Sequence, residues 1–303
     1  MDDNNKIVIN NLNEILLIPT DKLTLLQYLN FGYYFNEPLY NSLDKLTSLR
    51  RLTFSDEFNQ PLSNGLDKLT SLQCLTFGWY FNQPLSNSLD KLNSLEHLTF
   101  SFHFNQLLFN SLDKLTCLRR LTFGHKYVQL LTNSLDKLTC LQYLTFGNNF
   151  NQPLSNSLDK LTCLQYLTFG NNFNQPLSNS LDKLTLLQCL TFGDSFNKPL
   201  SNSLVKLTSL QQLTLGYHFD QQLDLPSNIK YLVLNCNNQY IIDNLHNDIE
   251  ELTFNWKFNL ELDNLPSSIK KIIIHNNDYD KELNNLPSSV EYIGLPFRYK
   301  KKY

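Results

Sequence analysis

The sequence has no alanine, a single methionine and two tryptophans, and only 17% of its 303 residues are charged. Average soluble domains carry about 25% charged residues, so few side chains are available for salt bridges. The 25 Lys and Arg nearly balance the 28 Asp and Glu, giving a formal net charge of −3. This balance excludes a strong overall attraction to nucleic acid or to an anionic membrane, and we expect neither as a partner. The 42% hydrophobic content excludes a wholly disordered chain.

Long apolar stretches and targeting signals are absent as well. No run of 18 apolar residues occurs, so no membrane-spanning helix is expected. The first residues, MDDNNKIVIN, lack the positive charge and the apolar stretch of a signal peptide. These features predict a cytoplasmic protein that is not secreted.

The sequence is instead dominated by an internal repeat. The block LxxLTFGxxFNQPLSNSLDKLTx recurs with a period of 23 residues and forms nine units over residues 26–228. Four shorter units and a basic tail follow in 229–303, and residues 1–25 precede the first full unit as a cap or half-coil. Such a repeat predicts one solenoid of 13 stacked coils.

The unit at 141–163 illustrates the predicted coil. Leu144 and Phe146 alternate with Tyr143 and Thr145, which predicts a short strand with the first pair facing inward. Gly147 is expected to end the strand because glycine tolerates turn dihedrals. The following SLDKL segment predicts one helical or 3₁₀ turn.

The predicted fold is thus α/β and β-rich, a leucine-rich-repeat-like solenoid. One parallel β-sheet lies on its concave side, and short turns or 3₁₀ segments lie on its convex side. A column of asparagines after the second Phe of each coil is expected to bond the backbone of adjacent coils. Its members are Asn36, Asn59, Asn82, Asn105, Asn151, Asn174 and Asn197.

Before the first full coil, residues 1–25 are expected to close the solenoid. Ile7 and Ile9 are predicted to form a capping strand, and Leu16, Ile18 and Leu23 to cover the first core layer. After residue 223, shorter back turns of the LPSS type are expected to change the curvature.

Catalytic and metal-binding patterns are missing from the repeat. No CxxC pair and no glycine-rich phosphate loop occurs, and the many Ser and Asp residues belong to one structural turn. We expect no catalytic residues, no cofactor and no metal. His97, His103 and His125 on neighbouring coils leave a metal or acid–base site as an alternative, and an enzyme on a β-helix is the most distant reading.

Three of the six cysteines, Cys117, Cys140 and Cys163, share one repeat position. They are expected to stack about 4.8 Å apart on successive coils. Small buried thiols in a reducing compartment are the expectation, with disulfides or a thiolate column as alternatives.

The phrase FNQPL within this frame resembles the FNIP repeat family, which is found in social amoebae and giant DNA viruses. It stands at residues 58–62, 81–85, 150–154 and 173–177. The resemblance implies the cytoplasm of a host cell if the protein is viral. Viral relatives often carry an F-box before the repeats, which implies substrate recruitment to a ubiquitin ligase. Only about 25 residues precede the first full coil here, too few for the roughly 40 residues of an F-box.

Positions that vary between coils are the candidates for binding. Aromatic side chains at exposed turns and arginines on strands are typical of protein interfaces. The predicted partner-binding residues are Tyr33, Tyr34, Arg51, Trp79, Tyr80, His97, Phe102, His103 and Arg120.

The sequence therefore predicts a non-catalytic module that binds a protein partner through the concave face and the rim where the strands end. The alternative is a substrate-recognition subunit of a ubiquitin ligase, with a host or ligase-related partner. We expect a monomer.

Overall fold

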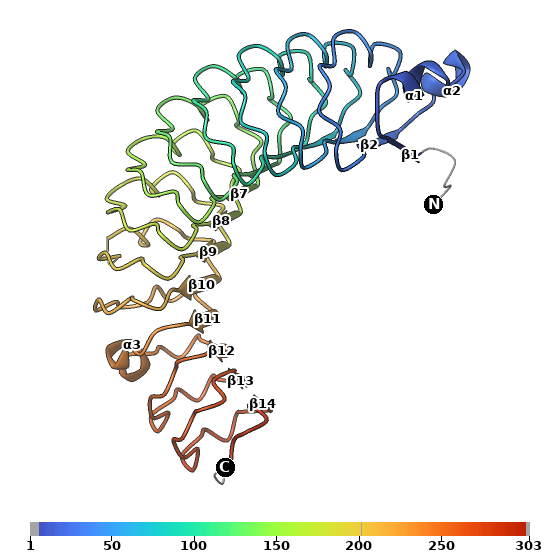
Figure 1. Cartoon of the computed structure of the whole chain (residues 1–303). Coiled ribbons are helices and arrows are strands. Elements are labelled where there is room, and N and C mark those ends of the chain that lie inside the picture. Colours follow the sequence, from blue (N-terminus) through green and yellow to red (C-terminus); the bar gives the residue numbers. More distant parts are fainter. Residues whose placement is uncertain (1–5, 201, 301–303) are drawn as a thin grey trace. The chain divides into compact units, whose positions relative to one another are not determined.

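The computed structural model describes residues 6–200 and 202–300, shown in chain order in Figure 1. The chain forms two compact units, residues 1–164 and 165–303. The first contains strands β1 (Lys6–Ile9), β2 (Tyr28–Phe31), β3 (Arg51–Thr53), β4 (Cys74–Thr76), β5 (His97–Thr99), β6 (Arg120–Thr122) and β7 (Tyr143–Thr145), with helices α1 (Asn13–Leu16) and α2 (Thr20–Leu23). The second contains β8 (Tyr166–Thr168), β9 (Cys189–Thr191), β10 (Gln212–Leu215), β11 (Tyr231–Leu234), β12 (Glu251–Phe254), β13 (Lys271–Ile274) and β14 (Tyr292–Gly294), with helix α3 (Gln239–Asp243).

Each unit is a parallel β-solenoid, as the repeat predicted. Among the described residues, each strand pairs in parallel with the next strand of its unit, one coil further along, so equivalent residues lie side by side. Within a strand, burial alternates: Leu144 and Phe146 are buried, whereas Tyr143 and Thr145 are partly exposed. The predicted inward and outward faces are therefore confirmed. In the described part of the chain, no helix is long and apolar enough to cross a membrane.

The core consists of columns of identical side chains. Phe54 stacks on Phe58 of its own coil at 4.2 Å between ring centroids and on Phe77 of the next coil at 5.4 Å. Leucines from the strand and the back turn fill the remaining space and are almost fully buried. Because each coil covers the open face of its neighbour, stability in such an array is a sum of nearest-neighbour contacts.

Glycine after the strand has a different role from the one predicted. In the described residues no glycine has a positive φ, so Gly147 is not needed for its dihedrals. A Cβ on Gly147 would instead lie 1.9 Å from the carbonyl oxygen of Gly124 in the preceding coil. Close packing between coils, rather than turn geometry, therefore demands glycine here. Where Ser101 replaces it, the hydroxyl donates a hydrogen bond to the carbonyl of Phe81 at 2.6 Å.

The non-glycine residues with positive φ lie on the opposite side of the coil, and most directly follow the Pro-Leu pair of the repeat. Ser63, Ser86, Ser155 and their counterparts have positive φ although they are not glycines. The chain then makes successive i→i+3 hydrogen bonds, such as Leu161 N to Leu158 O at 3.0 Å and Leu164 N to Leu161 O at 3.0 Å. The back of the coil is thus a series of tight turns.

The asparagine column bonds the turns of adjacent coils as predicted. Asn59 Oδ1 accepts the backbone N–H of Asn82 at 2.9 Å, and Asn82 Oδ1 accepts that of Asn105 at 2.8 Å. A second column, which the sequence reading missed, reinforces it: Gln106 Nε2 donates to both the carbonyl and Oδ1 of Asn82. We call these two columns the amide ladder.

The N-terminal cap differs from its prediction at one residue. Strand β1 pairs with β2, and Ile9 and Leu23 are buried as expected. Leu16, however, is 80% exposed, and Ile15 is buried in its place. The short helix α1 turns Ile15 toward the first coil, which leaves the neighbouring Leu16 on the outside.

Candidate functional site

The two residues that follow each strand-exit Gly or Ser are held in columns by backbone hydrogen bonds. The N–H of Tyr80 donates to Asp56 O at 2.9 Å, that of His103 to Trp79 O at 3.1 Å and that of Lys126 to Phe102 O at 2.9 Å. Side chains at these turns therefore stand at a regular spacing along one rim of the first unit.

Aromatic rings stack along this rim on the third to fifth coils. The rings of Trp79 and Phe102 lie 4.1 Å apart and 5° from parallel, and His125 continues the stack at 4.8 Å from Phe102. Beside them, Tyr80 and His103 lie 5.2 Å apart. We call these five residues the aromatic ladder. Trp79 and Tyr80 remain 46% and 45% exposed, so the ladder presents apolar surface to solvent.

Two charged groups border the aromatic ladder. The Nζ of Lys126 lies 5.9 Å from the Phe102 ring centroid, a cation–π distance. On the other side, Asp56 Oδ1 accepts the backbone N–H of Trp79 at 3.2 Å and anchors the start of the stack. The aromatic ladder thus has an acidic group at one border and a basic group at the other.

Tyr33 and Tyr34 form a separate aromatic pair. Their rings meet edge to face at 4.8 Å, and both are exposed. The acidic turn Asp56–Glu57 lies between this pair and Trp79 along the rim. Desolvation raises the pKa of Tyr33, followed by the nearby charges of Asp56 and Glu57.

A second row lies on the outward face of the strands, where Arg51, Cys74, His97, Arg120 and Tyr143 are side by side in register. We call these residues the strand-face row. The guanidinium of Arg120 lies 4.1 Å from the Tyr143 ring centroid. Burial lowers the pKa of His97, and the adjacent Arg120 lowers it further, because both disfavour a second positive charge.

The structure thus brings together four of the nine predicted residues, Trp79, Tyr80, Phe102 and His103. It pairs His97 with Arg120 on adjacent strands, and the strand of Cys74 separates Arg51 from His97. The predicted set omitted His125, which belongs to the aromatic ladder, and Lys126, which borders it. His125 and Lys126 occupy the same repeat positions as Phe102 and His103, so the sequence alone was enough to identify them.

The same coils also depart from the repeat on the limb that descends from the rim. Leu107 and Leu130 stand where the typical unit has proline, and Phe109 stands where it has serine; all three are exposed. The sequence reading missed this apolar patch, although the departures from QPLSN were visible. Packing does not require it, because the buried Leu108 and Leu131 already fill the core.

The cysteine prediction was partly wrong. All six thiols are free, but only Cys236 is buried, and Cys117 and Cys140 are exposed. Their shared position directly precedes the first core leucine of the strand, so the side chain points away from the core. Burial raises the pKa of the Cys236 thiol to about 12.

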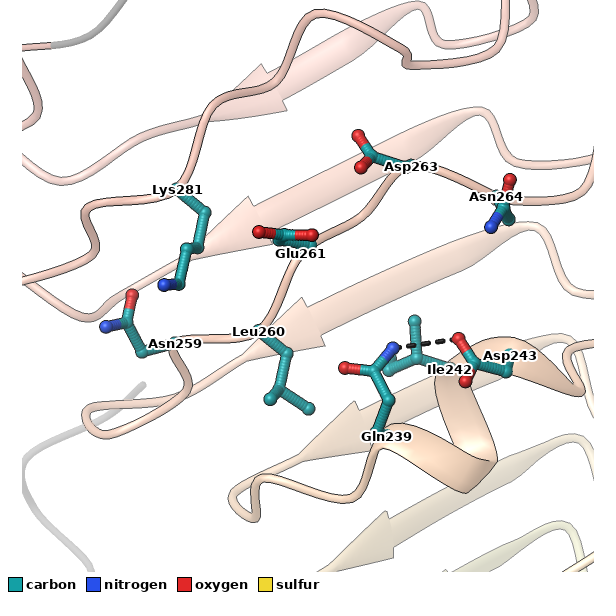
Figure 2. A pocket seen from close by; sticks show the side chains of 9 residues that line it. All are labelled: Gln239, Ile242, Asp243, Asn259, Leu260, Glu261, Asp263, Asn264 and Lys281. Carbon is teal, nitrogen blue, oxygen red and sulfur yellow. Dashed lines mark hydrogen bonds between the residues drawn. The ribbon is translucent and has the colours of Figure 1, made fainter.

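A polar hollow of about 380 Å³ lies in the second unit, beside α3 (Figure 2). Gln239 Nε2 donates to Asp243 Oδ1 at 2.8 Å, and Glu261, Asp263 and Lys281 line the rest. Across residues 6–200 and 202–300, no group of three or more His, Cys, Asp or Glu side chains is placed to hold a metal ion. His97, His103 and His125 of the first unit therefore do not form such a group.

The coil geometry defines the chain as a leucine-rich-repeat-like solenoid. Residues 258–297 match the FNIP repeat family, so the chain carries FNIP repeats, as the FNQPL phrases indicated. The match lies among the shorter coils of the second unit. No curated protein sequence matches the chain.

Solved structures share this fold. CroV588, a circular leucine-rich-repeat protein of a giant virus, is 28% identical with a TM-score of 0.50, over 89% of this chain and 50% of that one. Toll of Drosophila, in complex with Spatzle, is 17% identical with a TM-score of 0.61, over 88% and 42% of the two chains. An internalin of Listeria monocytogenes is 18% identical with a TM-score of 0.57, over 92% and 83%. The chain thus spans half the length of CroV588.

Proposed function

We propose that the chain is a non-catalytic interaction module in the cytoplasm that binds a protein partner through the aromatic ladder and the adjoining strand-face row. The observation that carries the proposal is the stack of Trp79, Phe102 and His125 at turn positions where the typical unit has asparagine. Core packing does not require rings there. Partly exposed Trp and Tyr side chains are the residues that contribute most to protein interfaces.

The strand-face row supplies charge beside this apolar surface. Among the described residues, neither Arg51 nor Arg120 has a carboxylate within salt-bridge distance, and each guanidinium lies near a tyrosine ring instead. A guanidinium held this way loses little conformational freedom on binding. It is suited to a carboxylate of a partner, so the expected partner surface is apolar with acidic groups at one side.

The apolar patch of Leu107, Phe109 and Leu130 supports the same location. It lies on the fourth and fifth coils, the coils that carry Phe102 and His125 of the aromatic ladder. The fourth and fifth coils therefore depart from the repeat at two places, the rim and the limb that descends from it. Clustered exposed apolar side chains on a soluble protein mark interaction sites.

The test is affinity capture of partners from cells with the wild-type chain and two variants. Trp79→Ala and Arg120→Ala are each expected to weaken binding of the partner by about 30-fold, since a truncated anchor of this kind costs about 2 kcal/mol, and the double variant by about 1,000-fold if the two costs add. The matched control is Tyr217→Ala, an exposed aromatic residue in the same rim column of the second unit. It should bind as the wild type does.

Two results would contradict the proposal: equal binding by the double variant and the wild type, or loss of binding in the Tyr217→Ala control alone. Co-purification of ubiquitin-ligase adaptor and scaffold subunits with the wild-type chain would assign the module to substrate recruitment.

A further inference from the structure

The strands beneath the strand-face row are interior strands of the sheet. β4 pairs with β3 on one side and with β5 on the other, and β5 pairs in turn with β6. β3 and β6 have further partners in β2 and β7. A bound segment cannot add a strand here, because strand addition needs an exposed sheet edge. It must therefore lie on the outward side chains.

A segment that lies on side chains receives few backbone hydrogen bonds from the sheet. An extended segment has no internal backbone bonds, so its covered N–H and C=O groups would lose water without gaining partners. An α-helix bonds its own backbone groups internally. The outward face of β3 to β6 therefore favours a helical segment over an extended one.

The spacing of the exposed side chains fits the same element. Successive members of the strand-face row stand on adjacent strands, which lie about 4.8 Å apart. In the aromatic ladder, the Trp79–Phe102 and Phe102–His125 ring centroids are 4.1 and 4.8 Å apart. One turn of an α-helix rises about 5.4 Å, whereas side chains on one face of an extended segment repeat about every 6.7 Å. Each helical turn therefore meets about one coil.

Short side chains separate the strand-face row from the aromatic ladder. The second outward position of each strand on the second to fifth coils is a half-exposed threonine; we call Thr53, Thr76, Thr99 and Thr122 the threonine column. Along a strand the column stands about 7 Å from the strand-face row, and the aromatic ladder begins three residues further on. An α-helix with its side chains has a radius of about 5–6 Å. A helix centred over the threonine column therefore reaches the side chains of both rows.

Charge in the strand-face row defines acidic positions on such a helix. Arg51 and Arg120 are exposed and stand three strands apart, about 14 Å. Half-buried Cys74 and His97 occupy the two strands between them. Residues eleven apart on a helix share one face and lie three turns, or about 16 Å, apart along the axis. Two carboxylates at that separation can meet both guanidiniums, because all four side chains are flexible.

The charges of the two outer coils also give the helix a direction. On the second coil, Asp56 and Glu57 of the rim balance the two arginines of the strand side. On the fifth coil, Arg120 and Lys126 have no carboxylate within salt-bridge distance among the described residues. The C-terminal end of a helix carries a partial negative charge and is stabilised by cations. The fifth coil is therefore the better place for that end.

We propose that the docking element of the partner is an amphipathic α-helix, which lies along the threonine column with its C-terminal end at the fifth coil. Two carboxylates about eleven residues apart bind Arg51 and Arg120, and an apolar stripe beside them contacts the aromatic ladder. This inference rests on the proposed function, since it assigns a class of partner to the same surface.

The experiment measures fluorescence anisotropy of synthetic peptides mixed with the full chain. The first probe is a stapled helix of about 24 residues, long enough to span the four coils, with two glutamates eleven residues apart and a stripe of leucines beside them. The second has one glutamate moved to the opposite face. The third has prolines at two solvent-facing positions and no staple, so it cannot form the helix. The first probe is expected to bind at least about tenfold more tightly than the other two.

Charge reversal tests the register of the helix. Arg51→Glu and Arg120→Glu should each weaken binding of the first probe by about 30-fold, because a like charge replaces an ion pair. A lysine in place of the N-terminal glutamate of the probe should restore binding to Arg51→Glu alone. A lysine in place of the C-terminal glutamate should restore binding to Arg120→Glu alone. Arg298→Glu, at an arginine of the second unit, is the matched control and should bind the first probe as the wild type does.

Equal binding of the three probes would overturn the proposal, as would a wild-type chain that does not bind the first probe. Rescue of both variants by the same lysine, or in the reverse order, would also overturn it. Circular dichroism checks that each variant is folded. Failure here is separable from failure of the proposed function: if Trp79→Ala and Arg120→Ala still lose a captured protein partner while the first probe does not bind, the surface stands and the helix does not.

Discussion

The outward strand faces of the two units differ in how their charges are neutralised. In the second unit, Glu250 Oε1 and Oε2 accept from the Nζ atoms of Lys230 and Lys270 at 3.0 and 2.9 Å, and Glu251 accepts from Lys271 at 2.9 Å. In the first unit, Arg119 and Glu96 form an ion pair at 3.9 Å at the position of Glu250, just before the strands, whereas Arg51 and Arg120 on the strands themselves lie near tyrosine rings. At the first outward strand position, the second unit therefore has the ion pair Glu251–Lys271, whereas Arg51 and Arg120 of the first unit have no carboxylate within salt-bridge distance among the described residues.

This difference shows which features are fixed by the coil and which are not. Inward columns are nearly identical in both units, because each side chain must fill the space left by its neighbours. Outward positions meet only solvent and adjacent outward residues, so their identities are free to serve binding.

The largest effect is expected from the shared core. Phe104 in the first unit and Phe258 in the second are both fully buried and stack on other rings of the core. Replacing either with alanine leaves a cavity and should lower the free energy of unfolding by about 3–5 kcal/mol. Chemical denaturation of the two variants is expected to give similar losses. A loss below about 1 kcal/mol in one of them would show that the cores are not equivalent.

The position after the strand should separate coils that carry glycine there from coils that carry a side chain. In Gly147→Ala the new Cβ would collide with Gly124 O, and overpacking of this kind costs about 1–3 kcal/mol. The shorter coils carry Asn255 at this position, so room for a side chain exists there. Asn255→Ala should cost about 1 kcal/mol or less, for its lost hydrogen bond to Asn235. Thermal unfolding of the pair measures the contrast, and equal losses would contradict the close-packing explanation.

The amide ladder should contribute a smaller, local amount. Asn82→Ala removes the acceptor for Asn105 N–H and for the side chain of Gln106, at a cost of about 1–2 kcal/mol. Hydrogen exchange at the Asn105 amide should accelerate in this variant while the amide of Leu98 in β5 stays protected. Unchanged exchange at Asn105 would show that the amide ladder does not stabilise this turn.

His97 should make the first unit sensitive to mild acid. Because its pKa in the folded chain is below the unfolded value of about 6.5, the unfolded state binds the proton more readily. The stabilisation is therefore complete above about pH 6.5 and is lost as the pH falls through the lowered pKa. His97→Gln should flatten the melting temperature between pH 7 and about pH 5. An unchanged pH profile would contradict this assignment.

Glu250 should give the smallest effect, at lower pH. Hydrogen bonds from Lys270 and Lys230 lower its pKa below the ordinary value of about 4.3. The stabilisation is present above that value and disappears as the pH falls through the lowered pKa. Because the group is exposed, solvent screens the pair, and Glu250→Gln is expected to change the acid limb of the melting curve only slightly. A large change would show that these pairs contribute more than surface pairs usually do.

The coil was predictable from sequence because its packing repeats. The alternation at Leu144 and Phe146 and the amide column follow from a period of 23 residues, and the structure confirms both. The reason for Gly147 was not predictable, since the clash partner, Gly124 O, belongs to the preceding coil and becomes visible only when coils are stacked. The exposure of Leu16 likewise depends on how α1 turns, which periodicity does not determine.

Within the candidate site, the sequence indicated a rim but not its grouping. Ring stacking of Trp79 on Phe102 requires that successive turns superpose, whereas Tyr33 and Tyr34 are set apart by an acidic turn. The 23-residue spacing alone does not distinguish the stacked rings from the separate tyrosine pair.

Hydrogen–deuterium exchange of the chain with and without its captured partner tests the central claim most directly. We expect slower exchange on binding at residues 79–80, 102–103 and 125–126 and along β5 and β6, with no change on β12 and β13, whose Glu251 and Lys271 pair with each other. Protection confined to β12 and β13, with the aromatic ladder unchanged, would contradict it.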